Sequence, residues 1–123
     1  MRYAVRPPFR SRTYCHCRSC RGTTGSACVA WFTAAGTAFS WTAGEPRGYA
    51  SSSHAVRDFC ANCGTQLTFR DARRPDEIDV TTSSLDEPGG VLPEDHTWAS
   101  QALGSLPLGG GLPEHRKERS GEG

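Results

Sequence analysis

The chain has 123 residues, a length typical of one domain, with 14 basic and 13 acidic residues and a formal net charge of +1. This balance gives no positive field that would gather nucleic acid or an anionic membrane. No apolar run reaches the roughly 20 residues of a membrane span, and the start MRYAVRPPFR lacks the apolar segment of a secretory signal. We therefore predict a cytoplasmic protein that binds neither nucleic acid nor membranes and keeps its cysteines reduced.

Short runs with strand character follow one another along the chain, at residues 27–32, 37–41, 65–70 and 77–82. In the last two, apolar residues such as Leu67 and Ile78 alternate with polar neighbours, as in strands with one face in water. Turn-forming segments lie between them, at residues 42–46 and 85–90. We predict a mainly β, loop-rich domain over residues 1–114. A disordered tail without apolar residues is expected over residues 115–123.

Three cysteines lie within six positions in the segment CHCRSC, at Cys15, Cys17 and Cys20. In an extended segment, side chains two residues apart point the same way, so the first two thiols can converge and Cys20 can close through a turn. Three thiolates fill three of the four tetrahedral positions of zinc, which is the pattern of a catalytic site. His16 lies between two of these ligands and is expected to point the opposite way.

A second pair, Cys60 and Cys63, has the C-x-x-C-G form of a zinc knuckle, and Gly64 can take the positive φ that such a turn needs. The pair supplies only two ligands, so a structural zinc needs two more. A redox role is the competing interpretation, although no βαβ pattern surrounds the pair. We expect Cys28 to be a small core residue and not a metal ligand. We also expect four aromatic residues in the core, namely Trp31, Phe32, Trp41 and Phe69.

With both cysteine motifs placed, the sequence resembles the glutathione-dependent formaldehyde-activating family, which includes centromere protein V. The resemblance spans residues 2–113 and rests on CHCRSCR, FCANCGTQL, IDVTTSSLDEP, HTW and GLP. It implies a small zinc-binding, Mss4-like fold of twisted antiparallel sheets with two zinc sites. By resemblance, the catalytic-type ligands would be Cys15, Cys17 and Cys20. Half of a structural site would come from Cys60 and Cys63. His96 and Trp98 match a late H-x-W pattern and are expected to pack near the zinc.

The sequence departs from this family at its start. The first C-x-C element of the family should precede Arg2 and is absent here. A misplaced start codon is our preferred explanation, and loss of the element is the other. Either way, Cys60 and Cys63 would lack two partners. One alternative is a rearranged single site with four thiolates, which would close the catalytic zinc.

The resemblance implies a carbon–sulfur lyase that adds a thiol, glutathione or another such as mycothiol, to formaldehyde or another small aldehyde. One or two zinc ions and the small-molecule thiol would serve as cofactor and co-substrate. Arg18 and Arg21 flank the cluster and are weak candidates for binding a carboxylate of the thiol. The alternatives are a non-catalytic zinc-binding interaction module and an inactive, truncated member of the family.

Overall fold

The computed structural model describes residues 1–119, and it is mainly β with twisted sheets, as predicted from the sequence. Within these residues, nine strands form two sheets, and one short helix, α1 (Arg18–Thr24), lies beside them. The strands are β1 (Arg2–Val5), β2 (Arg10–Cys15), β3 (Val29–Ala35), β4 (Phe39–Ala43), β5 (Pro46–Ala50), β6 (Ala55–Cys60), β7 (Gln66–Asp71), β8 (Glu77–Thr81) and β9 (Asp95–Thr97). Short 3-10 turns occur at Gly36–Ala38, Thr82–Ser84, Pro88–Gly90 and Ala99–Gln101. Among the described residues, no helix is long and apolar enough to span a membrane.

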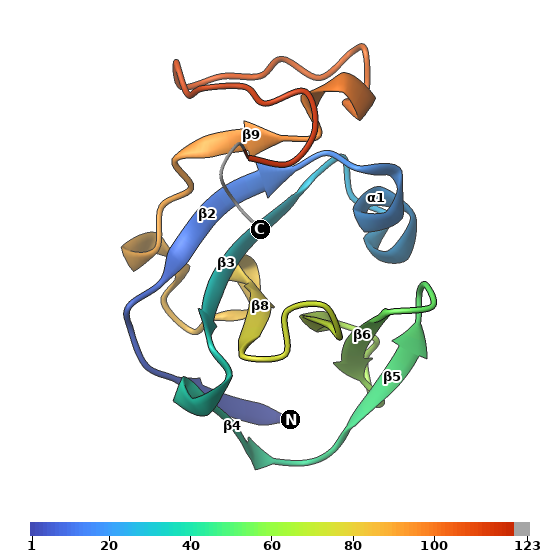
Figure 1. Cartoon of the computed structure of the whole chain (residues 1–123), viewed down its shortest axis with the longest axis vertical. Coiled ribbons are helices and arrows are strands. Elements are labelled where there is room, and N and C mark those ends of the chain that lie inside the picture. The colour runs from blue at the N-terminus through green and yellow to red at the C-terminus, as the bar shows by residue number, and fades with distance from the viewer. Residues whose placement is uncertain (120–123) are drawn as a thin grey trace.

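The larger sheet has seven strands in the order β5-β6-β7-β8-β3-β2-β9. All of its pairs are antiparallel except β2 with β9, which run parallel. The smaller sheet pairs β1 with β4. Figure 1 shows β2, β3 and β8 side by side through the centre, with α1 next to the end of β2 and with β5 and β6 farther away. The end of β2 therefore lies inside the fold, between β3 and β9.

Strand β3 is buried on both faces, which explains its nearly continuous apolar sequence. Phe32 and Ala34 point to one side and join Val80 of β8 in the main hydrophobic cluster. Val29 and Trp31 point to the other side, because side chains alternate along a strand, and they join a second cluster that contains cysteines. Strand β3 thus connects the core of the domain to the cysteine site.

The four predicted strand segments correspond to β3, β4, β7 and β8, with boundaries shifted by a few residues. Of the aromatic residues assigned to the core, Trp31 and Phe32 are buried, whereas Trp41 and Phe69 are half-buried. Short strands without strong apolar alternation, such as β1, β2 and β9, were not predicted. Helix α1 was not predicted either, because seven residues carry too little of a 3.6-residue period to be recognised.

The segment after residue 114 differs from the expected disordered tail as far as the structure describes it. The backbone N–H of Trp98 donates to the carbonyl of Lys117 at 2.8 Å, and that of Ala99 donates to His115 at 2.9 Å. The Arg119 guanidinium also donates to Asp95 at 2.6 Å. These are polar contacts, which the missing apolar residues could not reveal. Residues 120–123 of the predicted tail lie outside the described residues.

Candidate metal centre

The three clustered cysteines lie where β2 passes into α1. Cys15 is the last residue of β2 and is paired with Val29 of β3 and Thr97 of β9. Cys17 is the N-terminal cap of α1, and Cys20 lies within the helix. Their sulfur atoms all lie within 4.8 Å of one another. The strand and the helix turn thus produce the convergence that the spacing of CHCRSC predicted.

Backbone hydrogen bonds fix the conformation of this short segment. The Sγ of Cys17 accepts a hydrogen bond from the Cys20 N–H at 3.3 Å, so the thiol caps the helix. The Arg21 N–H donates to the Cys17 carbonyl at 3.0 Å, and the His16 N–H donates to Thr97 of β9 at 3.0 Å. The sulfur positions are therefore set by the sheet and the helix rather than by a free loop.

The sulfur atoms are close enough to share protons. Sγ of Cys15 and Sγ of Cys20 are 3.5 Å apart. The pKa of Cys17 is lowered, first by the hydrogen bond from Cys15 and then by that from Cys20. The pKa of Cys15 is raised by its hydrogen bonds with Cys17 and Cys20 and by burial. For Cys20 the bond with Cys15 lowers the pKa, but the bond with Cys17 and burial outweigh it, so the pKa is raised. Together these shifts favour one thiolate and two thiols in the cluster.

The geometry fits a metal ion. Two sulfurs that each lie about 2.3 Å from a tetrahedral zinc are about 3.8 Å apart, close to the separation of Cys15 and Cys20. Cys15 and Cys20 are buried, whereas Cys17 is half-exposed. Within residues 1–119 this is the only group of three or more Cys, His, Asp or Glu side chains close enough to hold an ion. It therefore offers three soft ligands and leaves one tetrahedral position without a protein ligand.

Arg57 of β6 also reaches the cluster, although no sequence pattern singles it out. Its side chain is buried, and its Nη1 lies 3.7 Å from Sγ of Cys20. Trp31 and Trp98 pack against the cysteines as well. Trp98 therefore lies beside the sulfurs that are predicted to hold the zinc. An arginine in a strand normally indicates a solvent-exposed side chain, so only the three-dimensional structure reveals the contact of Arg57.

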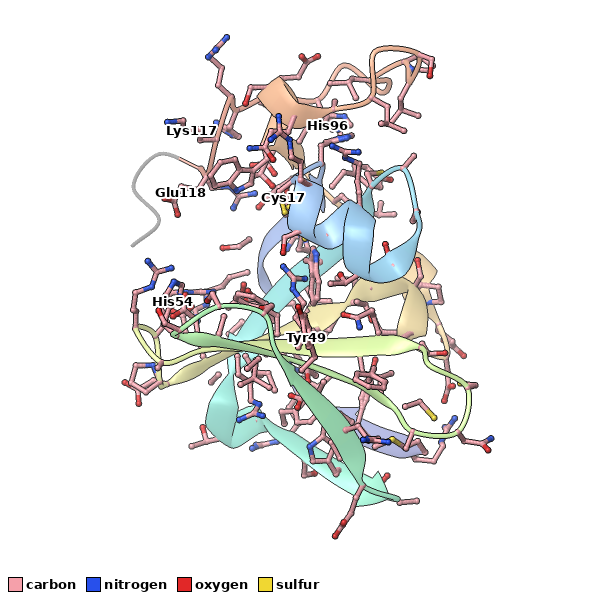
Figure 2. All side chains as sticks on the ribbon, turned by 90° about the vertical axis from the view of Figure 1, so that its right-hand side faces the viewer. Cys17, Tyr49, His54, His96, Lys117 and Glu118 are labelled. Carbon is pink, nitrogen blue, oxygen red and sulfur yellow. The ribbon has the colours of Figure 1, made fainter. Side chains whose placement is uncertain are left out.

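His16 points away from the sulfurs, as the alternation of side chains in an extended segment predicted. Its Nε2 lies 2.9 Å from Nδ1 of His96, and both rings are buried. Burial is the main reason that the pKa of His16 is lowered. Figure 2 shows His96 and Cys17 close together in the upper part of the view, while Tyr49 and His54 lie lower, below the helix. The two histidines form a buried pair behind the cysteine segment.

Cys60 and Cys63 lie apart from this group, at the turn after β6. The Gly64 N–H donates to the Cys60 carbonyl at 2.8 Å, and Gly64 has φ of 80°, the positive value expected for such a turn. The pKa of Cys63 is lowered, chiefly by a hydrogen bond from the Thr65 hydroxyl. Neither sulfur joins the three-cysteine group within the described chain, so the structure does not form the single four-thiolate site.

The remaining candidates differ in their surroundings. Arg18 is exposed, and its backbone N–H donates to Oε1 of Gln101 at 2.9 Å. Arg21 is half-buried, and its Nε donates to the His16 carbonyl at 3.3 Å. Cys28 is half-buried and lies outside the cluster, and burial raises its pKa. Of the two arginines, Arg18 therefore has the side chain that a dissolved ligand can reach more readily.

A surface cavity of about 400 Å³ lies at the small sheet rather than at the cysteines. Tyr3, Trp41 and Leu67 line it, together with Ser84 and Asp86 from the IDVTTSSLDEP segment. The Tyr3 hydroxyl lies 2.7 Å from Oγ of Ser84, which ties β1 to this segment. The motif thus borders the cavity and helps to attach the N-terminal strand.

Comparison with known proteins agrees with this architecture. A crystal structure of a Rhodobacter sphaeroides protein matches with a TM-score of 0.54 and 22% sequence identity, over 68% of this chain and 78% of that chain. At this identity the likeness concerns the fold alone. No curated protein gives a significant match. The family of glutathione-dependent formaldehyde-activating enzymes matches residues 1–101, which is most of the sequence. The chain therefore belongs to the glutathione-dependent formaldehyde-activating enzyme family.

Proposed function

We propose that the protein is a zinc-dependent enzyme that joins a low-molecular-weight thiol, such as glutathione, to formaldehyde or another small aldehyde. The observation that carries this proposal is the group of three cysteine sulfurs within 4.8 Å of one another, to which the described chain adds no fourth ligand. An interaction module needs a closed site with four protein ligands, whereas a catalytic site keeps one position open. The proposal includes a cytoplasmic location, because free thiols persist in reducing compartments.

The roles of the chain's own residues follow from their positions. Cys15, Cys17 and Cys20 would hold the zinc through their thiolates. Zinc bound there would supply positive charge that favours the thiolate form of an incoming thiol. The half-exposed Cys17 marks the side from which a dissolved thiol can approach. Arg18 is exposed next to it and would attract a carboxylate of a glutathione-like thiol.

The reaction balances without any further reagent. The thiolate sulfur attacks the carbonyl carbon of the aldehyde, a carbon–sulfur bond forms, and the carbonyl π bond breaks. The proton that the thiol lost ends on the new hydroxyl group, giving a hydroxyalkyl thioether. The reverse reaction cleaves the carbon–sulfur bond and is the lyase direction. The buried side of the cluster, formed by Trp31 and Trp98, would keep bulk water from the sulfurs there.

Cys60 and Cys63 would contribute two ligands to a second, structural zinc. Their turn has the hydrogen bonds and the positive φ of a knuckle.

The test is the rate of adduct formation above its uncatalysed background. Zinc-loaded protein, glutathione and formaldehyde are mixed, and adduct formation and breakdown are followed by exchange NMR. We expect a rate proportional to protein concentration that falls to background in Cys17→Ser and persists in the control Cys28→Ser. A wild-type rate equal to background with glutathione and with other thiols and small aldehydes would refute the catalytic proposal. Bound zinc to which no added thiol can coordinate would indicate the non-catalytic interaction module instead.

A further inference from the structure

Arg57 is a buried positive charge in the large sheet. It lies in β6, opposite Phe69 of β7 and Tyr49 of β5. Only 4% of its surface is exposed. Burying a guanidinium group is costly unless a negative charge or hydrogen-bond acceptors compensate for the lost water. Groups close to Arg57 must therefore compensate for its charge.

No carboxylate within residues 1–119 forms an ion pair with Arg57. The adjacent Asp58 is engaged on the other face of the strand, by Arg70 at 2.8 and 3.0 Å and by Thr68 at 2.8 Å. The Arg57 carbon Cζ instead lies 4.9 Å from the centroid of the Phe69 ring, a cation–π distance. Its Nε has no hydrogen-bond partner in the described structure. An aromatic face alone compensates for only part of the charge.

The guanidinium group of Arg57 also contacts the sulfur of Cys20. Nη1 of Arg57 lies 3.7 Å from Sγ of Cys20, in a buried N–H···S hydrogen bond. Three thiolates around a divalent cation leave a net charge of about −1, which a neighbouring guanidinium neutralises. The positive charge of Arg57 and the negative charge of the thiolate cluster therefore compensate for each other. Because Arg57 and Cys20 are 37 residues apart, this contact exists only in the folded chain.

We propose that Arg57 is a positioning residue of the metal centre. Its Nη1–H orients the Cys20 thiolate, and its charge offsets the negative charge of the cluster. This proposal rests on the metal site of the proposed function but not on the thiol–aldehyde reaction. It explains why a strand buried against aromatic residues carries an arginine without a carboxylate partner. Partners that hold a metal ligand through a hydrogen bond typically contribute 10–100-fold to metal affinity.

The experiment compares metal binding by the wild type and by Arg57→Met, which keeps an unbranched apolar stem and removes the charge. Zinc affinity is measured by competition with a chromophoric chelator, and cobalt is used as a spectroscopic substitute. We expect about 10–100-fold weaker binding and a shifted sulfur-to-cobalt charge-transfer band in Arg57→Met. We expect Arg57→Lys to recover part of both. The control Arg47→Met removes an exposed arginine from β5 and should change neither value.

The outcomes separate this proposal from the proposed function. Failure of the wild type to bind zinc or cobalt overturns the metal site and this proposal together. A wild type that binds metal, with unchanged affinity and band position in Arg57→Met, overturns the role of Arg57 alone. If Arg57→Met does not fold by circular dichroism, the neutral variant Arg57→Gln decides, and wild-type values in it would overturn the proposal. The absence of thiol–aldehyde activity leaves these binding measurements unaffected.

Discussion

The protons held by the three clustered cysteines predict how metal binding depends on pH. The pKa of Cys17 is lowered by hydrogen bonds from Cys15 and Cys20, so Cys17 is the thiolate before a metal binds. The pKa values of Cys15 and Cys20 are raised, so both keep their protons at neutral pH. A zinc ion that takes all three sulfurs as thiolates must displace these protons. We therefore expect about two protons to be released per zinc bound.

The sign and size of the pH effect follow from that count. Because binding releases protons, lowering the pH opposes binding and raising it favours binding. Each displaced proton changes the apparent affinity tenfold per pH unit as long as the pH stays below the pKa of the thiol concerned. Two protons therefore give about a 100-fold change per pH unit around neutrality. Cys17 adds nothing to this slope, since its pKa lies well below neutrality.

Isothermal calorimetry can count the protons directly. Zinc is titrated to one equivalent in buffers of different ionisation enthalpy, and the slope of the observed heat against that enthalpy is the number released. We expect about one fewer proton for Cys15→Ser and an unchanged count for the control Cys28→Ser. A release of about three protons would refute the shared-proton arrangement of the sulfurs, and a release near zero would refute the ligand assignment.

Three further predictions concern the stability of the domain. Phe32→Ala removes a fully buried side chain and should lower the unfolding free energy, measured in urea, by about 3–5 kcal/mol. The control Leu92→Ala removes an exposed side chain and should change this free energy by at most about 0.5 kcal/mol. Equal effects of the two substitutions would contradict the assigned core. Gly64 has φ of 80°, so Gly64→Ala should lower the unfolding free energy by about 1–2 kcal/mol. Gly22 lies in α1 with open space around it, so Gly22→Ala should raise the unfolding free energy by about 0.5–1 kcal/mol. The reverse order of stabilities in thermal unfolding would refute this prediction. The Arg73 guanidinium holds the pKa of Asp71 well below its usual range, so Asp71→Asn should destabilise the protein at pH 7. The difference in unfolding free energy should begin to shrink as the pH falls below about 4 and vanish only below the lowered pKa of the folded state. Urea unfolding that shows the same difference at pH 7 and pH 3 would contradict the shift.

The sequence predicted those parts of the fold and site in which chemistry is local. Alternating apolar residues located β7 and β8, and the spacing of CHCRSC was enough to predict that the sulfurs of Cys15, Cys17 and Cys20 converge. The alternation of strand side chains also predicted that His16 turns away. Each of these inferences depends on neighbours within a few positions, where backbone geometry alone decides the direction of a side chain.

Features that depend on distant partners could not be predicted in this way. Strand β9 has three residues and exists because it pairs in parallel with β2, about eighty positions earlier. Arg57 contacts Cys20 across 37 positions and resembles a surface arginine in sequence. The segment at residues 115–119 is held by backbone hydrogen bonds and an ion pair, which leave no apolar pattern. In each case the stabilising contact lies far away along the chain.

The placement of all three proposed metal ligands within six residues has a consequence for folding. A short unfolded segment that contains Cys15, Cys17 and Cys20 can already chelate zinc, so the metal binds both the folded and the unfolded chain. Linkage then limits how strongly zinc can stabilise the native state, because only the difference in affinity between the two states counts. What the fold adds is burial of the sulfurs and the charge of Arg57. The ratio of zinc affinities between the intact protein and a peptide of residues 12–23 therefore measures how much the sheet improves a site that the local sequence already encodes.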